Sequence, residues 1–212
     1  MLHEYYLNKS VKTTVQPKTK DELKKIIEDT IKEQGNNCDL NFIDTSLIKD
    51  MSTLFAESNF NGDISQWDVS NVRNMYCMFY ESDFNGDISK WDVSNVSNMC
   101  AMFYESNFNG DISKWNVSKV RDMSCMFKGS SFNGNISNWD VSNVENMNYM
   151  FSNSDFNQDI SKWDVSNVEN MNYMFAHSKF NKNISNWDVS NVKYTGNMFE
   201  GCPLENKPEY KP

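Results

Sequence analysis

Acidic side chains that could do chemistry recur at one fixed spacing in this chain. An aspartate column repeats every 24 residues, with asparagine in two copies: Asp63, Asp87, Asp111, Asn135, Asp159 and Asn183. Stacked acidic turns could bind calcium, which needs several convergent carboxylates. A short polar side chain after Asn-Gly is also what a turn needs. A calcium-stabilised solenoid is therefore one alternative, and a turn role for these residues is the other. No copy has the distinctive acidic pair of a hydrolase, so we expect no enzymatic activity, catalytic residue or cofactor.

The cysteines and histidines do not follow the spacing of a disulfide framework or a metal site. The five cysteines are an odd number at irregular positions: Cys38, Cys77, Cys100, Cys125 and Cys202. His3 and His177 lie far apart, and no C-x-x-C pair occurs. Zinc sites need such clusters, so we expect free thiols, no metal ion and a reducing compartment.

A repeat of 24 residues positions all of these side chains. Its clearest marker is a tryptophan column: Trp67, Trp91, Trp115, Trp139, Trp163 and Trp187. A single unit cannot bury its own apolar face, so successive units are expected to stack into a solenoid with this structural core ladder inside. The alternative is an exposed tryptophan strip that stacks on sugar rings, but such an apolar patch would be unusually large for a monomer.

The apolar spacing within one unit predicts a short strand and a helical turn. Ile64 follows an Asn-Gly-Asp turn and favours β structure, so a strand is expected near residues 63–65. Met75, Met78 and Phe79 have the i, i+3, i+4 spacing of a helix face. Because packed helices lie farther apart than paired strands, we expect an α/β repeat solenoid, leucine-rich-repeat-like and curved, with its helical turns on the convex face.

Both ends of the chain depart from the repeat. Thr19 and Glu22 form a capping-box pattern and Gly35 a stop signal, which predict a capping helix over residues 20–34. The expected organisation has three parts. Residues 1–36 form an N-terminal extension with this helix, and residues 37–205 form a solenoid of about seven coils, of which the first and last are degenerate. Residues 206–212 form a tail.

The copies differ mainly on the polar side of the expected helical turn, and we expect recognition there. Aromatic and basic residues at these variable positions are the candidates for a convex-face binding site: Tyr76, Tyr80, Tyr104, Tyr149, Tyr173, Arg73 and Arg121. Tyrosine is enriched in interface cores. Alternatively these rings only shield neighbouring coils, since single surface aromatics are common.

The repeat resembles a known family. The run WDVSNVRNMYCMF and its copies WDVSNVSNMCAMF and WDVSNVENMNYMF resemble the repeat of BspA-like leucine-rich-repeat surface proteins, and more narrowly the mycoplasma-type lipoprotein repeat of unknown function. This resemblance covers residues 37–204. It implies an α/β solenoid at the cell surface, a role in adhesion or protein binding, and no catalytic residues.

Composition narrows the class of partner. The chain has 29 Asp and Glu residues against 20 Lys and Arg, without a basic run, which disfavours nucleic acid. Its start lacks the pattern of an export signal and no apolar run is long enough to span a membrane, so sequence alone favours the cytoplasm and no membrane insertion. We expect a monomeric, non-catalytic repeat module that binds a protein partner. The alternative is a surface adhesion or structural protein that binds glycan or matrix.

Overall fold

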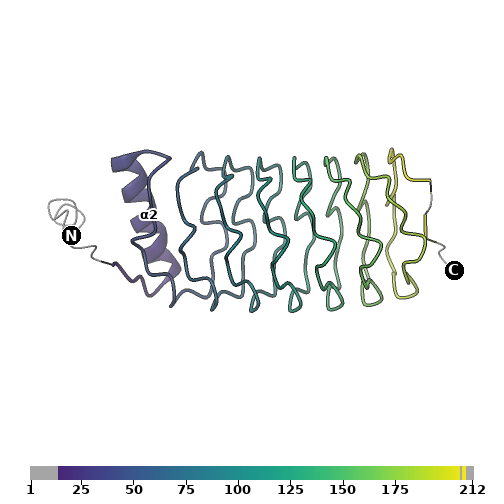
Figure 1. Cartoon of the computed structure of the whole chain (residues 1–212), viewed down its shortest axis with the longest axis horizontal. Helices are drawn as coiled ribbons and strands as arrows, with labels where there is room; N and C mark the ends of the chain where they lie inside the picture. Colours follow the sequence, from purple (N-terminus) through teal and green to yellow (C-terminus); the bar gives the residue numbers. More distant parts are fainter. Residues whose placement is uncertain (1–13, 206, 209–212) are drawn as a thin grey trace.

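A row of stacked coils behind a single helix makes up the molecule (Figure 1). The computed structural model describes residues 14–205, 207 and 208, so residues 1–13 of the expected extension and most of the expected tail lie outside the described residues. Within the described residues, α2 (Lys20–Gln34) is the one helix, and no strand forms. Isolated parallel bridges take the place of strands and join residues one repeat apart: Asp50, Asn74, Asn98, Asp122, Asn146, Asn170 and Tyr194.

Each coil is built from β-turns whose apolar ends face the core. Trp67 N donates to the Ile64 carbonyl at 3.1 Å, and Val72 N donates to the Val69 carbonyl at 2.9 Å. The same pairing recurs in the following copies. All four of these side chains are buried. Apolar residues three apart are therefore the two ends of a turn.

The expected α/β repeat solenoid of strand and helix units is wrong. Met75 and Met78 do not belong to a helix, because Met78 N donates to the Met75 carbonyl at 3.2 Å and closes another β-turn. The strand expected near residues 63–65 is reduced to a single bridge between Asp63 and Asp39. Without helical turns there is no helical convex face, and Figure 1 shows the coils in a straight row.

Hydrogen bonds between coils explain why the Met-x-x-Met-Phe segment is not helical. Met75, Cys77 and Phe79 donate their backbone N–H groups to carbonyls of the next coil at 2.9–3.0 Å. To point these groups along the stack, Cys77 and Glu81 adopt φ angles of 52° and 48°, in the left-handed region. Each N–H that bonds to the neighbouring coil is unavailable to a helix, so stacking determines the local conformation.

The tryptophan column lies in the core. Its six side chains are only 3–5% exposed, and neighbouring rings stack, as Trp67 and Trp91 do at 6.5 Å with 2° between their planes. Each indole N–H also finds an acceptor, since Trp115 Nε1 donates to the Ile88 carbonyl at 3.1 Å. A buried indole needs such a partner. The rings are therefore not available as a strip for stacking on sugars.

Helix α2 covers the first coil. It begins after Thr19, whose hydroxyl accepts from Glu22 N at 3.2 Å, and ends at Gly35, whose N–H donates to the Ile31 carbonyl at 2.8 Å. Its bounds match the helix expected from the capping pattern. The buried Leu23 and Ile27 join the core cluster. Neither α2 nor any other part of the described chain offers a helix long and apolar enough to cross a membrane.

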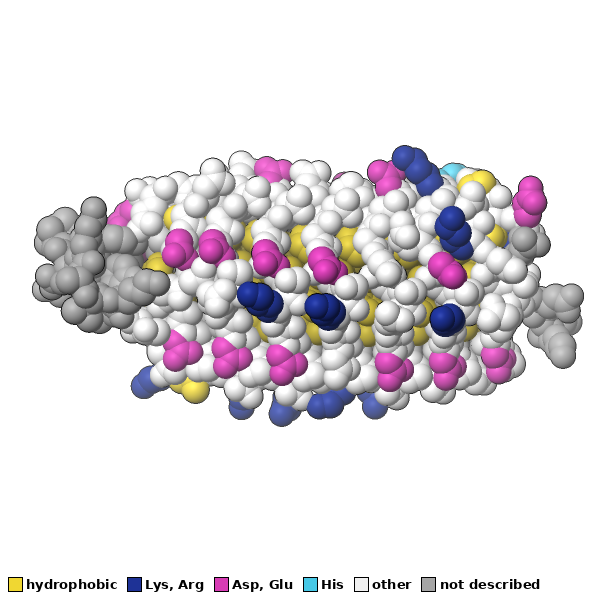
Figure 2. Space-filling model, in the orientation of Figure 1, with side chains coloured by type: hydrophobic (Ala, Val, Ile, Leu, Met, Phe, Trp, Pro, Cys, Tyr) yellow, Lys and Arg dark blue, Asp and Glu magenta, His cyan; other side chains and the backbone are white. Residues whose placement is uncertain are grey.

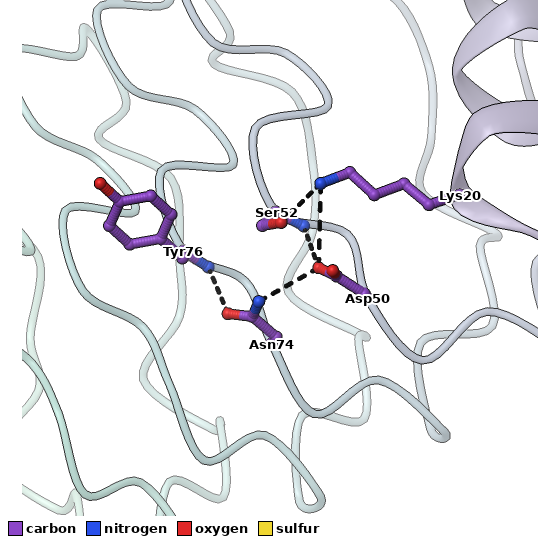
Figure 3. A network of polar contacts seen from close by, with 5 residues as sticks. All are labelled: Lys20, Asp50, Ser52, Asn74 and Tyr76. Carbon is purple, nitrogen blue, oxygen red and sulfur yellow. Dashed lines mark hydrogen bonds and ion pairs between the residues drawn. The ribbon is translucent and has the colours of Figure 1, made fainter.

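Polar contacts tie the start of α2 to the bridge ladder (Figure 3). Lys20 Nζ donates to the Ser52 hydroxyl and lies 4.0 Å from the Asp50 carboxylate. Asn74 Nδ2 donates to the same carboxylate at 3.2 Å, and Tyr76 N donates to Asn74 Oδ1 at 3.1 Å. The contacts thus run from the helix through the first coil into the second.

Removing a core tryptophan should be costly. Trp115→Ala is expected to lower the free energy of unfolding by about 3–5 kcal/mol, because a large buried ring is lost. Trp115→Phe retains most of the apolar area and removes only the indole bond to the Ile88 carbonyl, which still accepts from Trp91 N at 3.2 Å, so a smaller cost of about 0.5–1.5 kcal/mol is expected. Chemical denaturation measures both values. An unchanged midpoint for the alanine variant would contradict the buried position.

Adding a glycine at one left-handed position and removing a glycine from another should change the stability of the fold in opposite directions. Glu57 is exposed with φ 55°, and its equivalents in two later coils are Gly129 and Gly201. Glu57→Gly should stabilise the fold by about 0.5–1 kcal/mol, because the left-handed cost of about 1–2 kcal/mol exceeds the added chain entropy. Gly129→Ala should destabilise it, since the new Cβ would lie 2.6 Å from Glu105 Cγ at φ 67°. Thermal unfolding of both variants tests this pair, and equal shifts in the same direction would refute it.

Candidate functional site

Four of the five candidate tyrosines form one strip across neighbouring coils. Tyr80 and Tyr104 stack with ring centroids 4.6 Å apart, and so do Tyr149 and Tyr173, with 13° and 4° between the ring planes. All four are partly exposed. Lys128 lies between the pairs, with Nζ 5.1 Å from the Tyr104 centroid and 4.9 Å from the Tyr149 centroid. We call these five residues the tyrosine strip.

The register of the repeat builds this strip. Tyr80, Tyr104 and Lys128 occupy one column, 24 residues apart, while Tyr149 and Tyr173 occupy a column three residues earlier in the unit. Because like columns superimpose, residues of one column stack on each other. The long side chain of Lys128 places its ammonium group beside Tyr104 of its own column and beside Tyr149 of the other column. Each of its cation–π contacts contributes about 0.5–1 kcal/mol at an exposed site.

Hydrogen bonds to carboxylates and partial burial raise the phenol pKa at three tyrosines of the strip. Hydrogen bonding to Glu81 raises the pKa of the Tyr80 phenol. Burial, followed by hydrogen bonding to Glu105, raises the pKa of Tyr104. Burial also raises the pKa of Tyr149. These three phenols are therefore neutral at physiological pH.

The remaining candidates lie in other columns and do not join the strip. Tyr76 is 44% exposed, and Arg73 is exposed as well. Arg121 forms an ion pair with Glu145 of the next coil. Sequence reasoning did not single out Lys128, although its place in the column of the first tyrosine pair was the available signal.

The aspartate column serves the turns of the coil. Asp63 Oδ1 accepts from Ser65 N at 2.9 Å, and the later copies, asparagines included, make the same bond. Hydrogen bonds from these serines lower the pKa of the aspartates, as at Asp87 and Asp111. In the described part of the chain no three His, Cys, Asp or Glu side chains gather to hold a metal ion. This arrangement fits the turn role better than calcium binding.

The cysteines are free, as the sequence predicts. Burial raises the pKa of the Cys100 thiol to about 11, and it also raises the pKa values of Cys38, Cys77 and Cys125. A reactive cysteine needs a lowered pKa to form its thiolate. These four thiols are consequently protonated at neutral pH and have little reactive thiolate.

The coils define a class of protein in which β-turn units of 24 residues stack through backbone hydrogen bonds. The family described as "Mycoplasma protein of unknown function, DUF285" matches residues 22–133 and 105–210, and the chain belongs to this family. The match supports the mycoplasma-type part of the resemblance and does not extend it to BspA-like proteins. None of the curated proteins and none of the solved structures matches the chain.

Acid should weaken the fold through the aspartate column. The folded-state pKa values of Asp87 and Asp111 lie below the unfolded value of about 3.9. Their contribution to stability is therefore present above about pH 4 and is lost as the pH falls through the folded pKa values. An Asp87→Asn, Asp111→Asn variant keeps the Oδ1 acceptors without titrating. Its urea midpoint should fall less than the wild-type midpoint between neutral pH and about pH 2, and an equal fall would exclude these two groups.

Proposed function

We propose that this chain is a non-catalytic protein-binding module whose contact surface is the tyrosine strip. The observation that carries the proposal is the pair of stacked tyrosine pairs joined by Lys128. Tyrosine supplies a large amphipathic contact area while losing little rotamer entropy, and it is common at interface hot spots. A strip of four such rings is well suited to a protein partner.

Backbone hydrogen bonds hold the residues of the strip between neighbouring coils. The Tyr80 and Lys128 carbonyls accept from Glu57 N and Glu105 N, each at 2.7 Å, which ties them to the preceding coils. Tyr149 N and Tyr173 N donate to the following coils at 2.8 and 2.9 Å. Little backbone entropy would therefore be lost when a partner binds, and pre-organisation of this kind favours affinity.

The acidic residues support a role without catalysis. A general acid at neutral pH needs a raised pKa, whereas hydrogen bonds from serine lower the pKa values of Asp63 and Asp159. The same aspartate or asparagine environment also recurs from coil to coil, without one distinctive site. These carboxylates accept hydrogen bonds within the turns of the coils.

Binding should depend on both tyrosine pairs. The first variant, Tyr80→Ser with Tyr104→Ser, introduces the residue found at the equivalent position in Ser152. The second, Tyr149→Asn with Tyr173→Asn, introduces the residue found at Asn197. Each double variant should weaken the affinity at least about a hundredfold, because hot-spot tyrosines commonly contribute about 2 kcal/mol or more each.

The partner is first isolated by affinity capture from the producing cells, purified, and then titrated against each variant. Tyr194→Asn is the matched control, because Tyr194 is 56% exposed, lies outside the strip, and has asparagine at equivalent positions of other coils. It should bind as the wild type does. Folded double variants that retain full affinity would show that the strip is not the contact surface.

A further inference from the structure

A polar groove lies on the side of the coils that carries the aspartates. Figure 2 shows acidic side chains in two rows along the molecule, with lysines between them. The repeat has the same order, since Asp87 and Asp92 flank Lys90 in the sequence. Later in the stack lies a groove with a volume of about 670 Å³, and the residues that line it are Gln158, Asp159, Ser161, Lys182, Asn183, Ser185 and Asn186. We call it the polar groove.

Two departures from the repeat create the walls of the polar groove. Gln158 and Lys182 occupy the column that holds glycine in four earlier coils: Gly62, Gly86, Gly110 and Gly134. These glycines place no side chain where Gln158 and Lys182 stand. Asn186 also lines the groove, but it shares its column with Asn138 and is not particular to these coils. The groove therefore belongs to these two coils, while the repeat itself does not require it.

Hydrogen bonds hold the amide side chains of the groove in fixed orientations. Gln158 Nε2 donates to Asn133 Oδ1 at 3.1 Å, and Asn186 Nδ2 donates to the Ser161 carbonyl at 2.9 Å. Asn183 Oδ1 accepts from Ser185 N at 2.9 Å. Two amide oxygens and one amide nitrogen are thereby left as oriented acceptors and a donor for a ligand.

The charges in the groove balance each other. The ammonium groups of Lys162 and Lys182 contribute to lowering the pKa of Asp159, after the hydrogen bonds from Ser161, so this carboxylate is ionised beside positive charge. The other lining side chains are neutral amides and hydroxyls. The surrounding rows are acidic and would repel an anionic ligand. A neutral ligand fits this balance.

We propose that the polar groove binds a neutral oligosaccharide. Sugar hydroxyls both donate and accept, so they match a wall that mixes amides, hydroxyls, a carboxylate and an ammonium. The groove has no aromatic or aliphatic lining residue to anchor a peptide side chain or an acyl chain. This site is separate from the tyrosine strip and does not depend on the proposed protein-binding function.

The proposal is tested by NMR. The full chain is titrated with maltotetraose, cellotetraose or chitotetraose, and its amide chemical shifts are recorded at each step. At least one of these neutral sugars should shift resonances of residues 158–161 and 182–186, with a dissociation constant on the order of 1 mM, because the contacts are solvent-exposed hydrogen bonds. A sulfated tetrasaccharide should bind more weakly, since the acidic rows oppose it.

A double glycine variant and a matched control connect binding to the groove. Gln158→Gly with Lys182→Gly restores the residue of the earlier coils and should weaken the best sugar at least about tenfold, since two hydrogen-bonding side chains are lost. Lys90→Asn, which introduces the residue found at Asn138 and Asn186, lies outside the groove and should leave the affinity unchanged. The proposal is overturned if no neutral sugar shifts these resonances at about 10 mM, if the sulfated sugar binds best, or if the folded glycine variant binds as the wild type does.

Discussion

Backbone hydrogen bonds between neighbouring coils are the constraint on which the structure depends. In every coil but the last, alternate N–H groups of the segment equivalent to residues 75–79 donate to carbonyls 23 residues later, as Met75 N does to Asn98 O. This register is compatible with one repeat length only, so the chain keeps 24 residues per unit without insertion. It also places like side chains on one another, which produces the stacked tryptophans and phenylalanines of the core.

The same constraint separates structural positions from free ones. Asp63 holds its turn through Ser65, so its column keeps the short polar residues Asp and Asn. Asn71 Nδ2 donates to the Ser46 carbonyl of the preceding coil at 2.9 Å, and its column keeps asparagine in every later copy except Lys119. Side chains that neither fill the core nor hold a turn can vary between copies. Both proposed binding surfaces come from such variation: Lys128 interrupts a tyrosine column, and Gln158 interrupts a glycine column. Recognition can therefore change from coil to coil while the framework is retained.

The period, the buried tryptophans and the limits of α2 could be read from the sequence, because each depends on residue types at fixed spacing. The local conformation of Met75 to Phe79 could not. Apolar residues three apart are equally the ends of a β-turn or one face of a helix, and Cys77 and Glu81 give no sign of their positive φ angles, since neither is glycine. The tyrosine strip was foreseen as separate rings. The two tyrosine pairs are joined because Lys128 of one column contacts Tyr149 of another column. A comparison of copies within a single column does not reveal such a contact.

The direction of the hydrogen bonds between coils has an electrostatic consequence. Along the row that contains Met75, Cys77 and Phe79, the donating N–H groups all point toward the C-terminal coils, while the carbonyls of the same peptide units point toward α2. Their peptide dipoles add, as they do in a helix, so the row is partially negative at the end covered by α2. Lys20 places its ammonium group at that end, against Ser52 and Asp50. The capping helix thus contributes a positive charge where the aligned peptides favour one.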